Sequence, residues 1–451
     1  MKCKVAKEKA NLYMIMVAGA LLRLFYVCFS TIYERQYDIG QIDLDAGHTV
    51  SGGHLAYIQY FFHNGMPDFD PTSVYQFHHP PLHHAICAGW MKFCSLFIKN
   101  TEVVEEAIQV VPFVCSLLTL WLMYRIVNRF DISEKAKCFV MAIFAFHPAL
   151  VLLSGSVNND CMALLFTVWI VDLTMEWSKK PSFITIVKLA FAISLGMLVK
   201  QNVAEMAFPV AAVFLYVFIK NFKEKAKRNN LFGQFTVFGI ISIPIGMSFY
   251  IRNLVKFHMS MFWVYEISED SWQYTGNVPV LNRFLWPVPS DIIENLTQFR
   301  LGCGYNVWMQ IVRTSVLGEW DMATAGKPVK LLAVLLMFFG AILAFVALCA
   351  FVKIFIIDGI KNRKNIDVAV YLLFAIGYLV NMFCYLTFAY NYPQECSMNF
   401  RYITINLLFP AIAFGVVLHQ SKKKWFQAAS VGTLVAFALC SVAMIVYWAI
   451  A

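Results

Sequence analysis

The chain has 451 residues, of which 60% are hydrophobic and only 14% are charged. Soluble domains carry about 25% charged residues, so this composition excludes a soluble enzyme, a disordered chain and a secreted disulfide scaffold. The net charge of +9 comes from basic clusters that separate long apolar runs, which indicates membrane topology rather than nucleic-acid binding. We therefore predict an all-α polytopic membrane protein.

About eleven apolar runs are long enough to cross a bilayer, which takes roughly 20 helical residues. The first follows a basic start of the chain and is read as an uncleaved helix. In chain order, the predicted spans are 11–33, 106–127, 138–154, 160–176, 183–199, 205–221, 232–251, 330–357, 368–390, 402–418 and 426–451. No repeat and no soluble domain interrupts them, so residues 1–451 are predicted to form a single membrane domain.

Basic residues in short loops mark the cytoplasmic side of a membrane protein. With the N-terminus inside, five basic clusters all fall inside, provided that the semi-apolar stretch 83–99 does not cross. These clusters are 125–137, 179–180, 220–228, 361–364 and 422–424. The stretch 83–99 is short and follows two prolines, so it is predicted to be a helix lying at the outer interface.

This orientation places two long loops outside, residues 34–105 and 252–327. Loops of this length are usually functional or disordered. Their many aromatic residues and prolines favour ordered loops, the second covering a site. Shorter outer segments are the turn 155–160, residues 200–202 and residues 391–401.

Carboxylates in the first outer loop are candidates for proton transfer. Asp38 follows the first span almost directly, and a carboxylate at the membrane surface can accept a proton from an acceptor hydroxyl. A solvated loop acid is the alternative interpretation. Asp43 and Asp45 are substitutes for the same role.

Histidines are dense in the same loop. The stretch 54–62 has an amphipathic helical pattern, and His78, His79, His83 and His84 bracket two prolines. Neutral imidazole is a common metal ligand. A helix start whose histidines cap the chain or face water explains the pattern equally simply, and both interpretations stay open.

Charged residues at the predicted outer ends of later spans are a further signal. Lys200 and Arg401 break the charge rule there, which suggests a phosphate partner, although snorkelling to lipid headgroups is the alternative. Asp160 follows Asn158 and Asn159 at a helix start, where it could cap the helix or hold a cation or an acceptor.

These features follow one another along the chain on the same predicted side of the membrane. In this arrangement they resemble the GT-C glycosyltransferases, in particular the protein O-mannosyltransferases and the lipid A aminoarabinose transferase. The resemblance rests on the acidic first loop, Pro80-Pro81-Leu82 before an interfacial helix, Asn159-Asp160, Lys200 and the Phe-Arg-Tyr segment at 400–402. The family has Asp-Glu shortly before the tyrosine of the first interfacial helix. This chain has Gly53-His54 before Tyr57 instead, so the acidic base shifts upstream to Asp38.

The resemblance implies a GT-C fold with interfacial helices in the first outer loop and inverting transfer of a sugar from a polyprenyl-phosphate donor. The acceptor hydroxyl would belong to a glycan, lipid or protein outside the cytoplasm, with no nucleic acid involved. Asp38 would be the base, with Lys200 and Arg401 on the phosphate. Substrate contacts are expected from Arg35, Asp45, His54, Tyr57, His79, Asn159, Asp160, Lys200, Glu319 and Arg401.

No cofactor is required by this chemistry, but a divalent ion held by Asp160, His78 or His79 is left open. Compact loops favour a bacterial inner membrane. Two other functions compete with transfer: a secondary transporter, which would need charges at mid-membrane in related halves, and a non-catalytic lipid-binding protein.

Overall fold

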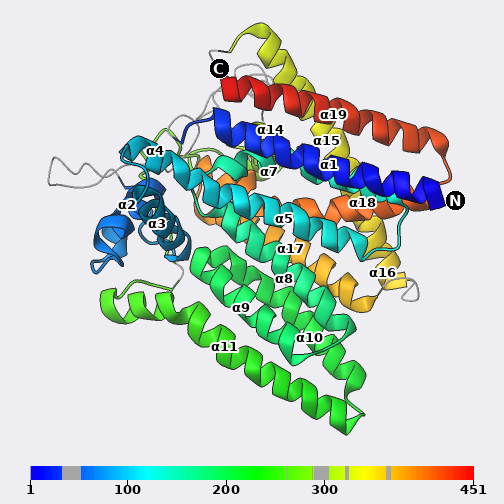
Figure 1. Ribbon diagram of the computed structural model, residues 1–451, viewed down its shortest axis with the longest axis horizontal. Coiled ribbons are helices and arrows are strands. Elements are labelled where there is room, and N and C mark those ends of the chain that lie inside the picture. Colours follow the sequence, from blue (N-terminus) through cyan, green and yellow to red (C-terminus); the bar gives the residue numbers. More distant parts are fainter. Residues whose placement is uncertain are drawn as a thin grey trace.

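The computed structural model describes residues 2–32, 52–261, 263–286, 288, 304–319, 325–361 and 367–450. Over these residues the chain is built from helices, and the one β contact is an isolated bridge between Tyr274 and Gln394. The chain is an integral multi-pass membrane protein, because most of its helices form a bundle of apolar segments that run roughly lengthwise (Figure 1).

In the described part of the chain, nine segments are long and apolar enough to cross a membrane. A bent pair of helices and one shorter apolar helix complete the set, so that each of the eleven predicted spans has a helical counterpart. The nine are Ala10–Phe29, Thr101–Asn128, Asp160–Lys179, Gln201–Asn221, Lys225–Phe257, Lys327–Ile357, Val368–Asn391, Cys396–Gln420 and Lys424–Ile450; the others are Glu134–Phe146 with Pro148–Gly155, and Phe183–Val199.

Within these spans the helices are α1 (Lys2–Phe29), α5 (Val110–Asn128), α6 (Glu134–Phe146), α7 (Pro148–Leu152), α8 (Asp160–Lys179), α9 (Phe183–Val199), α10 (Ala207–Asn221), α11 (Lys225–Phe257), α15 (Lys327–Phe351), α16 (Asp358–Lys361), α17 (Val368–Asn391), α18 (Leu408–Gln420) and α19 (Lys424–Ile450). Short 3-10 segments join some of them, among them η4 (Gln201–Met206) and η7 (Phe400–Leu407).

Local signals explain several helix ends. Ser133 and Ser182 cap α6 and α9 with their side chains, and Asp367 caps α17. Pro148 lacks the N–H that would continue α6, so α7 begins there with a bend of 54° between the two segments.

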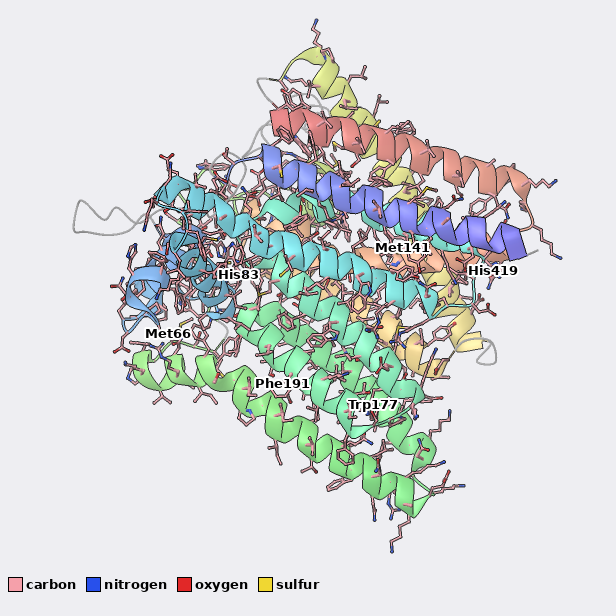
Figure 2. The ribbon with its side chains drawn as sticks, viewed as in Figure 1. Met66, His83, Met141, Trp177, Phe191 and His419 are labelled. Carbon is pink, nitrogen blue, oxygen red and sulfur yellow. The ribbon has the colours of Figure 1, made fainter. Side chains whose placement is uncertain are left out.

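Buried polar pairs hold the bundle together where apolar packing alone would not fix the register. Arg23 on α1 donates to Ser116 on α5 at 2.9 Å and to the Ala145 and Phe144 carbonyls of α6 at 2.9 and 3.0 Å. Trp177 on α8, labelled in Figure 2, donates to Gln234 on α11 at 2.7 Å. Because a buried polar group without a partner is costly, these bonds select one packing arrangement.

The segment between α1 and α5 contains helices that do not cross the bundle, as the sequence predicted for residues 83–99. These are α2 (His54–Asn64), α3 (Leu82–Ser95) and α4 (Thr101–Glu106). α3 spans only about 21 Å at 1.5 Å per residue, short of the ~30 Å hydrocarbon core. It packs against α2 at one end of the bundle, opposite the end where the N-terminus and the α18–α19 connection lie (Figure 1).

The second long loop begins later than the sequence indicated. α11 continues past Ile251 to Phe257, because its polar end finds partners: Arg252 donates to the Pro67 carbonyl at 2.6 Å, and Lys256 pairs with Asp68. The described part of the loop then forms α12 (Val280–Phe284) and α14 (Val307–Leu317). α14 packs against α7, α15 and η7.

The orientation predicted from the basic loops is open to a direct test. A cysteine placed at Ser73, in the α2–α3 loop, is expected to react with a membrane-impermeant maleimide on intact cells. A cysteine at Asn229, near the start of α11, should react only after the membrane is opened. Labelling should be measured against the parent chain, since Cys28 and Cys349 are exposed cysteines. Outside labelling at position 229 would reverse the topology.

Candidate functional site

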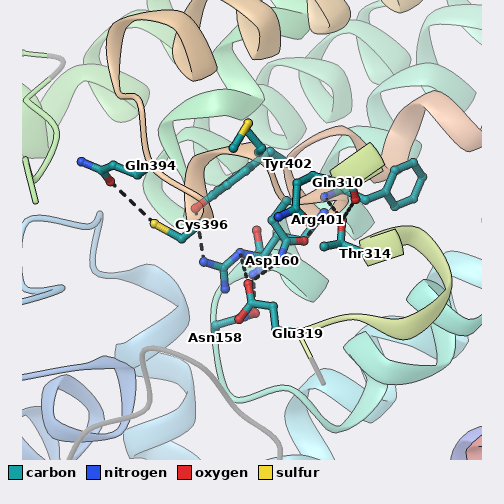
Figure 3. Close-up of polar contacts among 12 residues, drawn as sticks. Asn158, Asp160, Gln310, Thr314, Glu319, Gln394, Cys396, Arg401 and Tyr402 are labelled. Carbon is teal, nitrogen blue, oxygen red and sulfur yellow. Dashed lines mark hydrogen bonds and ion pairs between the residues drawn. The ribbon is translucent and has the colours of Figure 1, made fainter. Parts of the chain in front are cut away.

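Four charged side chains from separate elements meet in one cluster, of which Figure 3 labels Asp160, Glu319 and Arg401. Asp160 opens α8, Lys200 lies between α9 and η4, Arg401 belongs to η7, and Glu319 follows α14. Lys200 forms an ion pair with one Asp160 carboxylate oxygen. Arg401 Nε lies 3.8 Å from the other oxygen and 3.9 Å from Glu319 Oε1. Two cations and two carboxylates therefore form one cluster.

Burial makes this cluster stronger than a surface ion pair. Lys200 is 7% exposed and Asp160 is 5% exposed. Tyr402 flanks both cations: its ring centroid lies 4.9 Å from Lys200 Nζ, and its hydroxyl accepts a hydrogen bond from Arg401 Nη2 at 3.2 Å. At low local dielectric, such charges act on one another and on a bound ion far more than they would in water.

Short-range contacts fix where these side chains stand. Asn158 accepts a hydrogen bond from the Asp160 backbone N–H at 3.1 Å, which shapes the turn before α8. Asn159 donates to the Val199 carbonyl at 2.9 Å and so ties the start of α8 to the residue before Lys200. Asn159 is fully buried. In this structure Asn159 holds the start of α8 against the residue before Lys200, and its substrate contact stays a prediction.

Glu319 and Arg401 are held by residues that the sequence did not single out. Asn399 donates to Glu319 and accepts from the Arg401 backbone N–H at 2.9 Å. Gly318 ends α14 with φ +59°, a conformation that side chains with a Cβ rarely adopt. The one visible signal was Asn399 directly before the Phe-Arg-Tyr segment, a typical capping position.

The largest cavity at the cluster has a volume of about 410 Å³. Lys200, Arg401, His78 and His79 line its polar part. Much of the rest is apolar and comes from α10, α17 and the segment 263–267 after α11, and the polar side chains of Glu205 and Asn381 also line it. Phe208 of α10 is 63% exposed on the outside of the bundle. The cavity therefore joins a cationic end to an apolar wall that continues to the membrane-facing surface.

Two smaller cavities adjoin the cluster from the other side. Their volumes are about 80 and 50 Å³, and both are lined by Thr314, Gly318, Glu319, Asn399 and Arg401. Arg401 also lines the large cavity, whereas Glu319 does not. Arg401 thus stands between an apolar-walled chamber and a small polar one that contains Glu319, which suits a reaction between two substrates.

The histidines pack against one another instead of facing outward. His54 Nδ1 and His84 Nε2 are 2.9 Å apart, the His54 ring stacks on His79, and His83 Nε2 donates to the Val157 carbonyl at 2.7 Å. Tyr57 is 1% exposed and stacks on Phe77. His54 and Tyr57 therefore pack inside the α2–α3 unit, while His79 lines the cavity wall. Their role as substrate contacts stays a prediction.

The histidine arrangement does not by itself form a metal centre. In the described ranges, no group of three or more His, Cys, Asp or Glu side chains is placed to hold a metal ion. Asp160, the proposed carboxylate ligand, is engaged by Lys200 and Arg401. The acidic residues 38, 43 and 45 lie outside the described residues, so a metal ion stays a hypothesis.

Arg35, Asp38 and Asp45 are all outside the described residues. The chain leaves the described part at Ile32, which is fully buried in the same apolar cluster as Val157.

Acid should loosen the α2–α3 unit. Burial lowers the pKa of His83 to about 4, and it lowers the pKa values of His54, His79 and His84 as well, with nearby Lys200 adding to the effect on His54, His79 and His83. The unfolded unit would bind protons below about pH 6.5, before the folded unit does. Its stability is therefore complete above that pH and falls as the pH drops toward 4.

Hydrogen–deuterium exchange measures this loss directly. After correction for the intrinsic pH dependence of exchange, peptides from α2 and α3 should lose protection between about pH 7 and pH 5, and peptides from α19 should not. Equal protection of α2 and α3 at both pH values would contradict a role for neutral, buried histidines.

Comparison with known proteins agrees with this geometry. A family model described as dolichyl-phosphate-mannose-protein mannosyltransferase matches residues 78–247, a range that includes His79, Asp160 and Lys200. Over nearly its whole length, the chain also has the fold of a solved structure, that of the Archaeoglobus fulgidus oligosaccharyltransferase. The matched segment covers less than half of the chain, and the likeness to the solved structure shows the fold alone.

The match to the Archaeoglobus fulgidus enzyme, solved with Zn and sulfate, has a TM-score of 0.51 and 14% identity and covers 96% of this chain and 53% of that one. A second structure of that enzyme, with an inhibitory peptide and a dolichol-phosphate, matches with a TM-score of 0.51 and 13% identity. This match covers 98% of this chain and 56% of that one. The match to ArnT from Cupriavidus metallidurans has a TM-score of 0.40 and 14% identity, and it covers 98% of this chain and 78% of that one. The chain spans about half the length of that oligosaccharyltransferase. A search of curated proteins finds no match.

Proposed function

We propose that this chain is an inverting glycosyltransferase that moves a sugar from a polyprenyl-phosphate donor to an acceptor hydroxyl on the extracytoplasmic side. The observation that carries the proposal is the cavity of about 410 Å³ that joins Lys200 and Arg401 to an apolar wall. A polyprenyl chain needs a membrane-facing groove, and its phosphate needs buried cations. The dolichol-phosphate bound in the related archaeal oligosaccharyltransferase supports this donor class.

In the proposed reaction, the acceptor oxygen attacks the anomeric carbon while the bond from that carbon to the phosphate oxygen breaks. The electron pair of that bond leaves with the phosphate, and the acceptor proton passes to a carboxylate. Lys200 and Arg401 stabilise the negative charge that grows on the leaving phosphate. Because phosphate leaves readily, positioning and charge supply most of the rate.

Asp160 is proposed to keep Lys200 and Arg401 in place. Without it, two buried cations would repel each other and move toward solvent. The described cluster is balanced, with two cations and two carboxylates, so it is not strongly anionic or cationic before the donor enters. The cations are already in place when negative charge develops on the phosphate, so they stabilise this charge without having to move during the reaction.

Asp38 is proposed as the base that accepts the proton of the acceptor hydroxyl. Glu319 is proposed to bind the acceptor in the small polar cavities, where it lies on the far side of Arg401 from the donor chamber. The acceptor class stays a glycan, a lipid or a protein. A bacterial cell membrane, with the N-terminus in the cytoplasm, is the proposed location.

The test uses the purified full chain in lipid nanodiscs, supplied with a panel of polyprenyl-phosphate sugars. Released polyprenyl phosphate is measured by chromatography. The wild type should release it from at least one donor, and Asp38→Asn should lower the rate about 10²–10⁴-fold, the usual contribution of a general base. Asp68→Asn is the matched control, because Asp68 is an exposed carboxylate on the same loop.

Three results would contradict the proposal at different points. Unchanged release by a folded Asp38→Asn variant would remove Asp38 from the mechanism and leave the enzyme assignment standing. Tight donor binding by the wild type without any release would favour the non-catalytic lipid-binding alternative. Movement of the intact donor across the membrane would favour the transporter.

A further inference from the structure

A second large cavity lies on the opposite side of η7 from the donor cavity. Its volume is about 330 Å³, and α14, α15, α17 and α18 provide most of its wall. Phe400 and Ile403 of η7 face this cavity, while Arg401 and Tyr402 line the donor cavity. Both cavities are thus lined by η7, but each is lined by different residues of it.

The wall of this second cavity is almost entirely apolar. Val316, Leu343 and Phe437 are typical of it, and among the residues that the structure describes no Asp, Glu, Lys or Arg lines it. A phosphate or a sugar phosphate would have no ionic partner there. The cavity therefore differs in kind from the one at Lys200 and Arg401, and its volume is in the range of small-molecule sites.

Two buried polar side chains lie in the otherwise apolar wall. Asn406 is 5% exposed and His147 is 7% exposed, and both line the cavity. Among the described residues, neither the amide nitrogen nor the amide oxygen of Asn406 has a hydrogen-bond partner, and the same holds for Nδ1 of His147. Buried polar groups in native proteins almost always have partners, so these atoms point to a ligand that supplies them.

The cavity is bounded by residues that face the bilayer. Phe345 and Leu348 on α15 line it and are 69% and 39% exposed. Tyr378 and Met382 on α17 form the facing wall. Both helices are membrane spans, and exposed apolar side chains on a span contact lipid chains. An occupant can therefore enter sideways from the bilayer.

We propose that this cavity is a second lipid site, which takes a hydrocarbon chain bearing a hydroxyl group. The apolar wall fits the hydrocarbon. A hydroxyl both donates and accepts, so it satisfies the oxygen and the nitrogen of Asn406 together. An ester or ether oxygen only accepts and would leave the Asn406 oxygen unpaired. The site is separate from the proposed donor site and does not depend on the transfer reaction.

The experiment compares two probes of nearly equal size, hexadecan-1-ol and hexadecyl methyl ether. Both are titrated onto the detergent-solubilised full chain, and bound stoichiometry is read by native mass spectrometry. The alcohol should bind about 3–10-fold more tightly than the ether, as expected from one additional net hydrogen bond. In Asn406→Leu this preference should disappear, while the ether still binds.

A second pair of variants locates the binding. Ala344 lines the cavity, and Ala344→Trp should abolish binding of both probes by filling it. Ile342 lies on the same helix, is 37% exposed and does not line the cavity, so Ile342→Trp should bind like the wild type. Equal affinity for alcohol and ether, absence of binding by either probe, or unchanged binding in Ala344→Trp would each overturn the proposal.

Discussion

Replacing Arg401 by glutamine is expected to lower glycosyl transfer about 10²–10³-fold, the loss seen when one preorganised donor of transition-state charge is removed. Arg401 stands between the donor cavity and the small cavities that contain Glu319, so its charge acts on the leaving phosphate. The measurement is the single-turnover rate of polyprenyl phosphate release with saturating donor.

Arg252→Gln is the matched control, because Arg252 is a partly exposed arginine at the end of α11 that contacts Asp68. It should transfer at nearly the wild-type rate. Arg401→Lys should recover part of the rate, because it restores the charge without the planar guanidinium. If Arg401→Gln stayed folded and kept the wild-type rate, Arg401 would have no part in the chemistry.

The buried pair of Lys200 and Asp160 should show opposite behaviour for stability and activity. Breaking a buried ion pair by removing one partner costs about 3–5 kcal/mol of folding free energy, because the remaining charge is left buried. Asp160→Asn should cost more than Lys200→Met, since Asp160 neutralises both Lys200 and Arg401, whereas Arg401 remains near Asp160 when Lys200 is lost. Thermal unfolding in detergent measures these losses.

The double variant Lys200→Met with Asp160→Asn should recover much of the stability lost by the single variants, because neither buried charge is left without the other. It should not recover transfer, because the phosphate has lost Lys200. Recovery of both stability and transfer would show that the pair is structural only. Additive destabilisation would show that the two side chains are not coupled.

Much of the fold was predictable from the sequence because the bilayer imposes simple rules. Each apolar run of about 20 residues must become a helix, since no water is present to satisfy the backbone. The basic clusters and the short, proline-bounded segment at 83–99 then fixed the order of spans and the non-crossing α3. The end of α11 was predicted too early, because its continuation depends on contacts of Arg252 and Lys256 with a distant loop.

The site was only partly predictable. Lys200 and Arg401 stood out because they break the charge rule for outer loops, and Asp160 stood out as an acid at a helix start. That Lys200 and Asp160 form one pair follows only from the packing of α8 against α9. The histidines show the opposite case: their density suggested ligands or solvent-facing caps, but stacking places them inside the α2–α3 unit.

By itself, the sequence determined that this protein is a helical membrane protein, which segments span the membrane, and which charged residues are out of place for a lipid boundary. These properties depend on local composition, which acts over one helix length. Only the tertiary structure decided that these charges share one buried cluster, that Asn159 and Asn399 hold it, and that η7 separates two cavities. Those features arise from contacts between residues far apart in the chain, and packing complementarity leaves no local pattern in the sequence.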